Sequence, residues 1–142
     1  MEWIVLAGLL CTDELLGMED PPVKQRYNLH VRTQRFANRV RLFVHRVPKT
    51  ISTESDCKQL VRASGSVAAN YGEADEASSR RDFAAKLKIC KKEARECIVW
   101  LNLLNVQLPP DVDKERIALL KEADELVRIF FASIRTAGFS HI

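Results

Sequence analysis

Apolar residues recur at alternating spacings of four and three between positions 82 and 104, in the segment DFAAKLKICKKEARECIVWLNLL. The repeat begins at Phe83 and ends at Leu104, and the faces between carry Lys86, Lys88, Lys91, Lys92, Arg95 and Glu96. This spacing is typical of an α-helix that packs one face against other helices. Because an isolated amphipathic helix is only marginally stable in water, the segment predicts partner helices of similar length.

Two helices are predicted before this segment. The first covers residues 29–47, with Asn28 as a suitable N-cap and Pro48 after its end. The second starts between residues 52 and 55 and reaches about residue 77. The apolar positions expected to face the core from the first helix are Leu29, Phe36, Val40, Phe43 and Val47.

Ser78 and Ser79 offer an N-cap for the helix of residues 82–104, and a last helix follows Pro109 and Pro110. Either Asp111 or Asp113 is expected to cap that last helix, and Gly138 is expected to close it. Its predicted core face consists of Ile117, Leu120, Ala123, Val127, Phe130 or Phe131, and Ile134.

Four amphipathic helices with short, proline-containing connections predict an all-α fold, an antiparallel up-down-up-down four-helix bundle over residues 28–137. Residues 138–142 form a C-terminal tail, and residues 1–27 an N-terminal extension. Met18 as the true start is an alternative interpretation of that extension. Its apolar run of roughly nine residues is far short of a bilayer span and lacks the basic start of a signal peptide. A cytoplasmic protein without membrane contact is expected.

A run of small residues lies in the second helix, between Ala63 and Gly72. Each glycine in a helix interior costs about 1 kcal/mol relative to alanine, so close approach of a neighbouring helix is expected in return. The run serves either the core of the bundle or a contact with another subunit, and Asn70 is a candidate for a hydrogen bond between helices. The candidate residues for an interface or for helix packing are Ser66, Ala69, Asn70, Tyr71 and Glu73.

Positive charge is concentrated in one part of the chain. Residues 24–49 hold eight lysines and arginines and no acid, although the formal net charge of the whole chain is only +3. On the first helix no acid lies within reach for an i±4 ion pair, which makes its basic stripe the better candidate for phosphate contacts. A second basic group surrounds the third helix. The candidate nucleic-acid-binding residues are Arg32, Arg35, Arg39, Arg46, Lys49, Lys88, Lys91 and Lys92.

Catalytic and metal-binding patterns are not found in the sequence. The four cysteines form no Cys-x-x-Cys pair and no histidine stands at ligand spacing to them, so reduced thiols are expected. No glutamate is followed three residues later by histidine, the pattern that di-iron bundles require. Serine lacks a recognisable histidine and acid partner, and no glycine-rich phosphate loop is present. The sequence predicts no enzyme activity, no metal and no cofactor.

A set of short motifs in a fixed order resembles one protein family. The motifs are Arg32-Thr33, Phe36-Ala37, Arg39-Val40, Val47-Pro48-Lys49-Thr50, Gln59-Leu60-Val61-Arg62, Ser66-Val67-Ala68-Ala69-Asn70-Tyr71, Glu73-Ala74, Asp82-Phe83, Lys86-Leu87, Lys92-Glu93-Ala94 and Trp100-Leu101. Over residues 29–134 they are similar to the four-helix-bundle proteins encoded in intervening sequences of bacterial 23S ribosomal RNA genes. The accessory variability proteins of diversity-generating retroelements are a related group.

The resemblance implies an antiparallel bundle that assembles as a ring-like homopentamer, and association with nucleic acid. Combined with the basic stripes, it predicts a ring oligomer that binds RNA or DNA without sequence preference. The alternative is a protein–protein adaptor or accessory subunit, for example of a reverse transcriptase or ribonucleoprotein complex.

Overall fold

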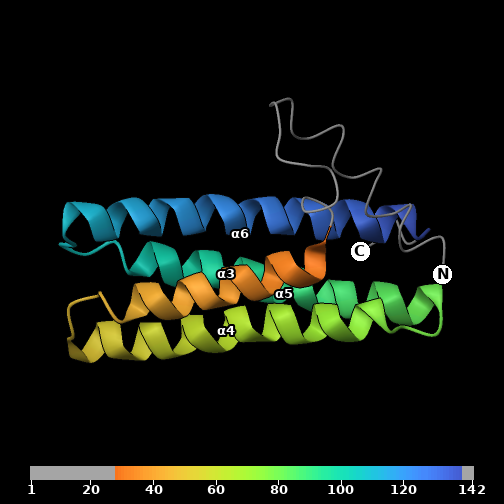
Figure 1. Cartoon of the computed structure of the whole chain (residues 1–142), viewed down its shortest axis with the longest axis horizontal. Coiled ribbons are helices and arrows are strands. Elements are labelled where there is room, and N and C mark those ends of the chain that lie inside the picture. The colour runs from red at the N-terminus through yellow and green to blue at the C-terminus, as the bar shows by residue number, and fades with distance from the viewer. Residues whose placement is uncertain (1–27, 139–142) are drawn as a thin grey trace.

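The computed structural model describes residues 28–138, which form four long α-helices and no strand within that range. The helices are α3 (Leu29–Val44), α4 (Ile51–Asp75), α5 (Arg80–Leu103) and α6 (Pro110–Thr136). Each helix packs against the next in the chain, and α3 also contacts α6. Figure 1 shows α4 and α6 on opposite sides of the molecule, with α3 and α5 between them. The predicted all-α four-helix bundle is confirmed.

The predicted extension of residues 1–27, the alternative start at Met18 and most of the tail lie outside the described residues. Within the described range, none of the helices combines the length and the apolar character that crossing a membrane requires.

Local capping determines where the first three helices begin. The side chain of Asn28 accepts a hydrogen bond from the Val31 amide at 3.1 Å, as predicted. In α4, Thr50 and Thr53 form a reciprocal capping box, so the helix starts slightly before the predicted window. Ser79 caps α5 by accepting from the amide of Asp82 at 3.1 Å. These bonds satisfy amide groups that have no partner inside the helix.

The start of α6 differs from the prediction. Pro109 occupies the N-cap position without a side-chain hydrogen bond, and Pro110 is the first helical residue. Asp111 and Asp113 therefore lie within the first turn, where their negative charges interact favourably with the helix dipole. Neither residue occupies the N-cap position. At the other end, Gly138 has a φ of 91°, consistent with its predicted role after the helix C-terminus.

The predicted apolar stripe of α5 forms the centre of the core. Each of its seven members is at most 2% exposed. They are Phe83, Leu87, Cys90, Ala94, Cys97, Leu101 and Leu104. All five predicted core residues of the first helix are buried as well, although α3 ends three residues before the predicted boundary and Val47 follows in a turn.

The buried face of α6 keeps the predicted Ala123, Phe130 and Ile134 and is otherwise rotated by one residue relative to the prediction. Leu119, Leu126 and Ile129 are buried, whereas the predicted core residue Ile117 is 55% exposed. Of the two adjacent phenylalanines, Phe130 is buried and Phe131 is not. The buried residues of this helix are Val112, Arg116, Leu119, Ala123, Leu126, Ile129, Phe130, Ser133 and Ile134.

Arg116 explains part of this rotation. Its side chain lies in a buried position at the turn between α5 and α6. It pairs with Asp113 at 2.7 Å and donates to the Leu101 carbonyl at 3.3 Å and to Oδ1 of Asn105 at 3.2 Å. A cation beside the last carbonyls of α5 interacts favourably with the negative, C-terminal end of the α5 dipole. A charged side chain thus takes a core position that the hydrophobic pattern assigned to its neighbour.

The two glycines of α4 lie beside side chains of α3, and the close helix-to-helix approach expected from the small-residue run is not found at them. A Cβ on Gly65 would meet only the guanidinium end of Arg41, at 3.3 Å, and one on Gly72 only the ring of His30, at 3.6 Å. The atoms that approach the glycines are therefore ends of side chains, not backbone.

We expect Gly72→Ala to raise the free energy of unfolding by about 0.5–1 kcal/mol, because 3.6 Å leaves room for a methyl group and alanine favours the helix. Gly138→Ala should lower it by about 1 kcal/mol, because alanine is strained at a φ of 91°. Urea denaturation followed by circular dichroism measures both. A lower free energy of unfolding in Gly72→Ala would contradict this prediction and show that the contact between α3 and α4 has no room for a methyl group at position 72.

Candidate nucleic-acid interface

The basic stripe of α3 faces acids of α6. Arg32 donates to both carboxylate oxygens of Glu122, at 2.7 and 2.9 Å, and to Glu125 at 2.7 Å. Its side chain is only 19% exposed. Burial opposes the charged guanidinium, but the hydrogen bonds and charges of Glu122 and then Glu125 outweigh it and raise the pKa of Arg32. This arginine is held in the protein, away from an incoming phosphate.

Two further arginines of α3 repeat the arrangement. Arg39 pairs with Glu115 at 3.0 Å, and Arg46 pairs with Asp111. We call the ion pairs of Arg32, Arg39 and Arg46 with α6 the α3–α6 ion-pair row. The first helix itself carries no acid, as the sequence shows, but acids of the last helix pair with three of the five candidate cations of this stripe. Arg35 and Lys49 form no ion pair with a described residue.

The cations of α5 have a different environment. At 100° per residue, positions 88, 91, 92 and 95 fall within about 100° of the helix circumference. Lys91, Lys92 and Arg95 form no ion pair with any acid in residues 28–138. Lys92 acts on Glu96 through its charge alone. Among the described residues, α5 thus presents three cations without an ion pair within little more than one helical turn, whereas the candidates without an ion pair at the α3 stripe are Arg35 and Lys49.

The neighbouring surface of α6 extends this region. Its residues Asp124, Arg128, Phe131 and Arg135 fall within about 60° of one another around the helix. The Lys91 ammonium lies 5.5 Å from the centre of the Phe131 ring, and the Arg135 guanidinium carbon lies 5.9 Å from it. The only acid among these four positions, Asp124, pairs with Arg128 at 2.7 Å. We call this region the α5–α6 basic face, made of Lys88, Lys91, Lys92, Arg95, Arg128, Phe131 and Arg135.

The five candidate interface residues of α4 separate into different environments. Tyr71 is buried and stacks on Phe130 with ring centres 6.1 Å apart, and burial, with a smaller contribution from Asp75, raises its pKa. Ala69 is exposed, and Glu73 pairs with Lys86 at the surface. Asn70 donates to the Ser66 carbonyl at 2.9 Å and to the Ser66 hydroxyl oxygen at 3.1 Å. Asn70 is therefore bonded within its own helix, and the predicted bond between helices is wrong.

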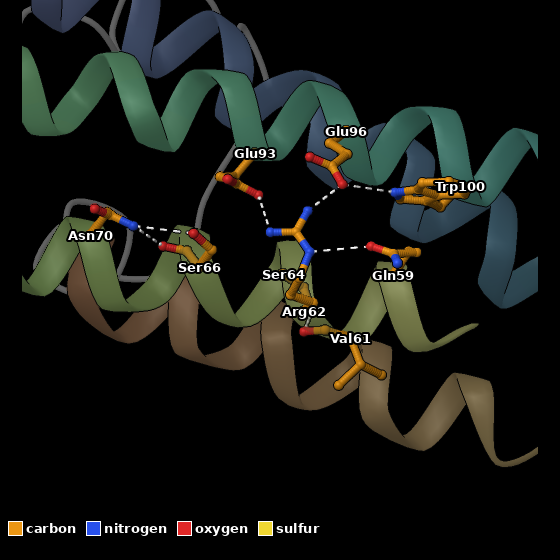
Figure 2. Close-up of polar contacts among 9 residues, drawn as sticks. All are labelled: Gln59, Val61, Arg62, Ser64, Ser66, Asn70, Glu93, Glu96 and Trp100. Carbon is orange, nitrogen blue, oxygen red and sulfur yellow. Dashed lines mark hydrogen bonds and ion pairs between the residues drawn. The ribbon is translucent and has the colours of Figure 1, made fainter. Parts of the chain in front are cut away.

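A polar cluster that the sequence did not single out joins α4 to α5. Figure 2 shows the guanidinium of Arg62 directed between Glu93 and Glu96, with the Trp100 indole on the far side of Glu96. Arg62 contacts Glu93 at 3.3 Å and also pairs with Glu96, and Trp100 donates to Glu96 at 3.1 Å. The hydrogen bond from Arg62 is the largest cause of a lowered pKa for Glu96. Burial acts in the opposite direction, and the hydrogen bond from Trp100 lowers the pKa further.

Within the described residues no three His, Cys, Asp or Glu side chains are grouped so that they could hold a metal ion. Cys57, Cys90 and Cys97 are free thiols, and burial raises the pKa of both Cys90 and Cys97 to about 12. At neutral pH these two thiols are protonated and poorly nucleophilic. Cys11 lies outside the described range.

The fold is that of an all-α four-helix bundle. A sequence model described as "23S rRNA-intervening sequence protein" matches residues 27–131, and the chain belongs to this family. Among solved structures, it is similar to a protein of unknown function from the S23 ribosomal protein family of Bacteroides thetaiotaomicron. The two are 27% identical with a TM-score of 0.63, over 75% of this chain and 98% of the other. No curated protein matches the chain significantly.

The Arg62 cluster predicts a pH-dependent signal from Trp100. The folded pKa of Glu96 lies below its usual value of 4.5, so its contribution to stability is complete above that pH and is lost as the pH falls through the lower folded value. In a Trp3→Phe background, Trp100 fluorescence should titrate with a midpoint below 4.5. Arg62→Ala should move this midpoint upward, and Lys114→Ala should not. An unchanged midpoint in Arg62→Ala would contradict the assigned cause.

Proposed function

We propose that this protein is a non-enzymatic, cytoplasmic member of its family that binds RNA or DNA, without sequence preference, through the α5–α6 basic face. The observation that carries the proposal is the contrast between the two basic surfaces. Three of the five candidate cations at the α3 stripe are paired with acids of α6, all but Arg35 and Lys49, whereas Lys91, Lys92 and Arg95 on α5 all lack an ion-pair partner in the described residues. Uncompensated cations gain most from phosphate, because binding releases counterions from the nucleic acid.

The composition of the bundle supports an electrostatic role. Residues 28–138 contain twenty lysines and arginines against fourteen acids, so the described part is more basic than the whole chain, whose formal charge is +3. A surface of this kind contacts phosphates, not base edges, and carries little sequence information. The family name refers to 23S rRNA, but the proposal does not depend on that name.

We also propose that the protein acts as a ring-shaped homo-oligomer, a pentamer as the family resemblance implies. The outer surface of α4 and α5 supports a subunit contact. Ile89, Val99 and Leu103 fall within about 80° around α5 and are 39–55% exposed, and the small Ala69 of α4 is exposed as well. Repetition of the basic face around a ring would add the phosphate contacts of each subunit.

A protein–protein adaptor is the second candidate function. The exposed apolar residues of α5 favour it, because such side chains can bind a protein partner in place of a second subunit. A subunit of a reverse transcriptase or ribonucleoprotein complex, as for the accessory variability proteins, would be a partner of this kind. Packed apolar contacts respond weakly to salt, whereas phosphate contacts weaken steeply.

Binding of a structured RNA and of duplex DNA at 50 and 200 mM salt tests the nucleic-acid proposal. With about four phosphate contacts, affinity should fall about 100-fold between these concentrations. The double variant Lys91→Glu/Arg95→Glu should weaken binding by about tenfold or more at 50 mM salt. Two doubles with the same change of charge serve as controls, Lys58→Glu/Lys114→Glu on other surfaces and Arg35→Glu/Lys49→Glu at the α3 stripe.

If the α3 double weakens binding more than the α5 double does, the binding surface is the one predicted from sequence. If the wild-type oligomer does not bind at 50 mM salt, the nucleic-acid proposal is wrong and the adaptor is favoured.

Ala69→Arg tests the subunit contact. Because Ala69 is exposed in the bundle, the variant should keep its helical content and melting temperature. Light scattering should show the mass of an oligomer for the wild type and of a monomer for the variant, because the long, charged arginine side chain would project into the proposed contact. Gln107→Arg, in the exposed connection between α5 and α6, is the matched control. A folded Ala69→Arg variant with wild-type mass would exclude this surface from the contact.

A further inference from the structure

Phe131 is an aromatic ring in an unusual position. It is 44% exposed, although the residue before it, Phe130, is completely buried in the core. Its ring carries two cationic side chains, from Lys91 on α5 and from Arg135 one turn further along α6. The backbone at this point belongs to a continuous helix, so the position of the ring is fixed by the burial of Phe130, Ser133 and Ile134.

An exposed ring beside uncompensated cations has the chemistry of a single-strand binding site. Proteins that hold single-stranded nucleic acid without sequence preference combine cations that follow the backbone with aromatic rings on which bases stack. A duplex offers phosphates to the same cations, but its bases already stack on one another and cannot reach a ring on a convex helical surface.

The cations that now lie over the ring do not prevent stacking. An exposed cation–π contact is weaker than the stacking of a base on an aromatic ring. Lys91 and Arg135 have long, flexible side chains, so both can move from the ring to adjacent phosphates when a base replaces them. Arg95 and Lys92 lie on the same stripe of α5 and extend the run of cations along that helix.

We propose that Phe131 is a base-stacking site for single-stranded nucleic acid, with Lys91 and Arg135 as the cations that hold the flanking phosphates. This inference rests on the proposed nucleic-acid function and makes it more specific, because it names single strands as the preferred ligand. It also gives a role to an exposed phenylalanine that the core does not need.

Fluorescence anisotropy with a labelled thymidine 12-mer and a labelled 12-base-pair duplex tests the proposal on the full chain. Phe131→Leu keeps an apolar side chain but removes the ring. It should weaken binding of the 12-mer by about tenfold and change binding of the duplex by less than twofold. The dependence of affinity on salt should stay the same, because no phosphate contact is removed.

Two further variants complete the test. Phe131→Trp should restore affinity, and in a Trp3→Phe/Trp100→Phe background its fluorescence should be quenched when the 12-mer binds. Leu42→Ala, which removes another exposed apolar side chain on α3, should bind both ligands like the wild type. Circular dichroism checks that each variant is folded.

The outcomes separate this inference from the proposed function. If Phe131→Leu binds the 12-mer as tightly as the wild type, or loses affinity equally for both ligands, the stacking site is refuted while nucleic-acid binding stands. If the wild type binds neither ligand at 50 mM salt, both proposals are refuted.

Discussion

The structure depends on the burial of one face of α5. Seven residues of this helix are almost inaccessible, and each large member contributes about 1.5–3 kcal/mol by leaving water. Because α5 packs against both α4 and α6, any rotation about its axis would expose these side chains on one side and bury lysines on the other. The orientation of α5 is therefore fixed by hydrophobic burial, and with it the direction of every charged residue on the helix.

The charges of the bundle follow from this orientation and serve two different purposes. The α3–α6 ion-pair row joins the first and last helices, whose backbones approach each other over fewer residues than those of the other neighbouring helices. Individual surface pairs contribute only about 0–1 kcal/mol, so the row specifies how α3 lies on α6 more than it stabilises the bundle. On the α5–α6 basic face, Lys91, Lys92, Arg95 and Arg135 form no ion pair with an acid of residues 28–138, and Arg128 pairs with Asp124.

The fold could be predicted from the sequence because it depends on local signals. The four-three spacing of α5, the caps at Asn28 and Ser79 and the breaks at Pro48 and Pro109 all act within a few residues. The errors occur where a tertiary contact overrides such a signal. Arg116, buried beside the end of α5, takes the core position that the pattern assigned to Ile117, and a hydrophobic pattern cannot anticipate a satisfied guanidinium in the core.

The candidate site was harder to predict, because ion pairs between helices depend on register. A signal for the α3–α6 ion-pair row was present: Arg32, Arg39 and Arg46 recur every seven residues, and Glu115 and Glu122 have the same spacing. Antiparallel helices place such series opposite each other, and i±4 spacings within one helix give no sign of these pairs. The rotation of α6 about its axis also decides whether Phe130 or Phe131 faces solvent. The sequence therefore could not identify Phe131 as the exposed ring.

Chemical modification of lysines, followed by mass spectrometry with and without a saturating single-stranded oligonucleotide, tests the central claim most directly. The claim is that the α5 cations without an ion pair form the binding surface. We predict that Lys91 and Lys92 are protected by the oligonucleotide, while Lys49, Lys58 and Lys114 react at unchanged rates. Protection of Lys49 with no protection on α5 would contradict the claim and place the ligand on the first helix.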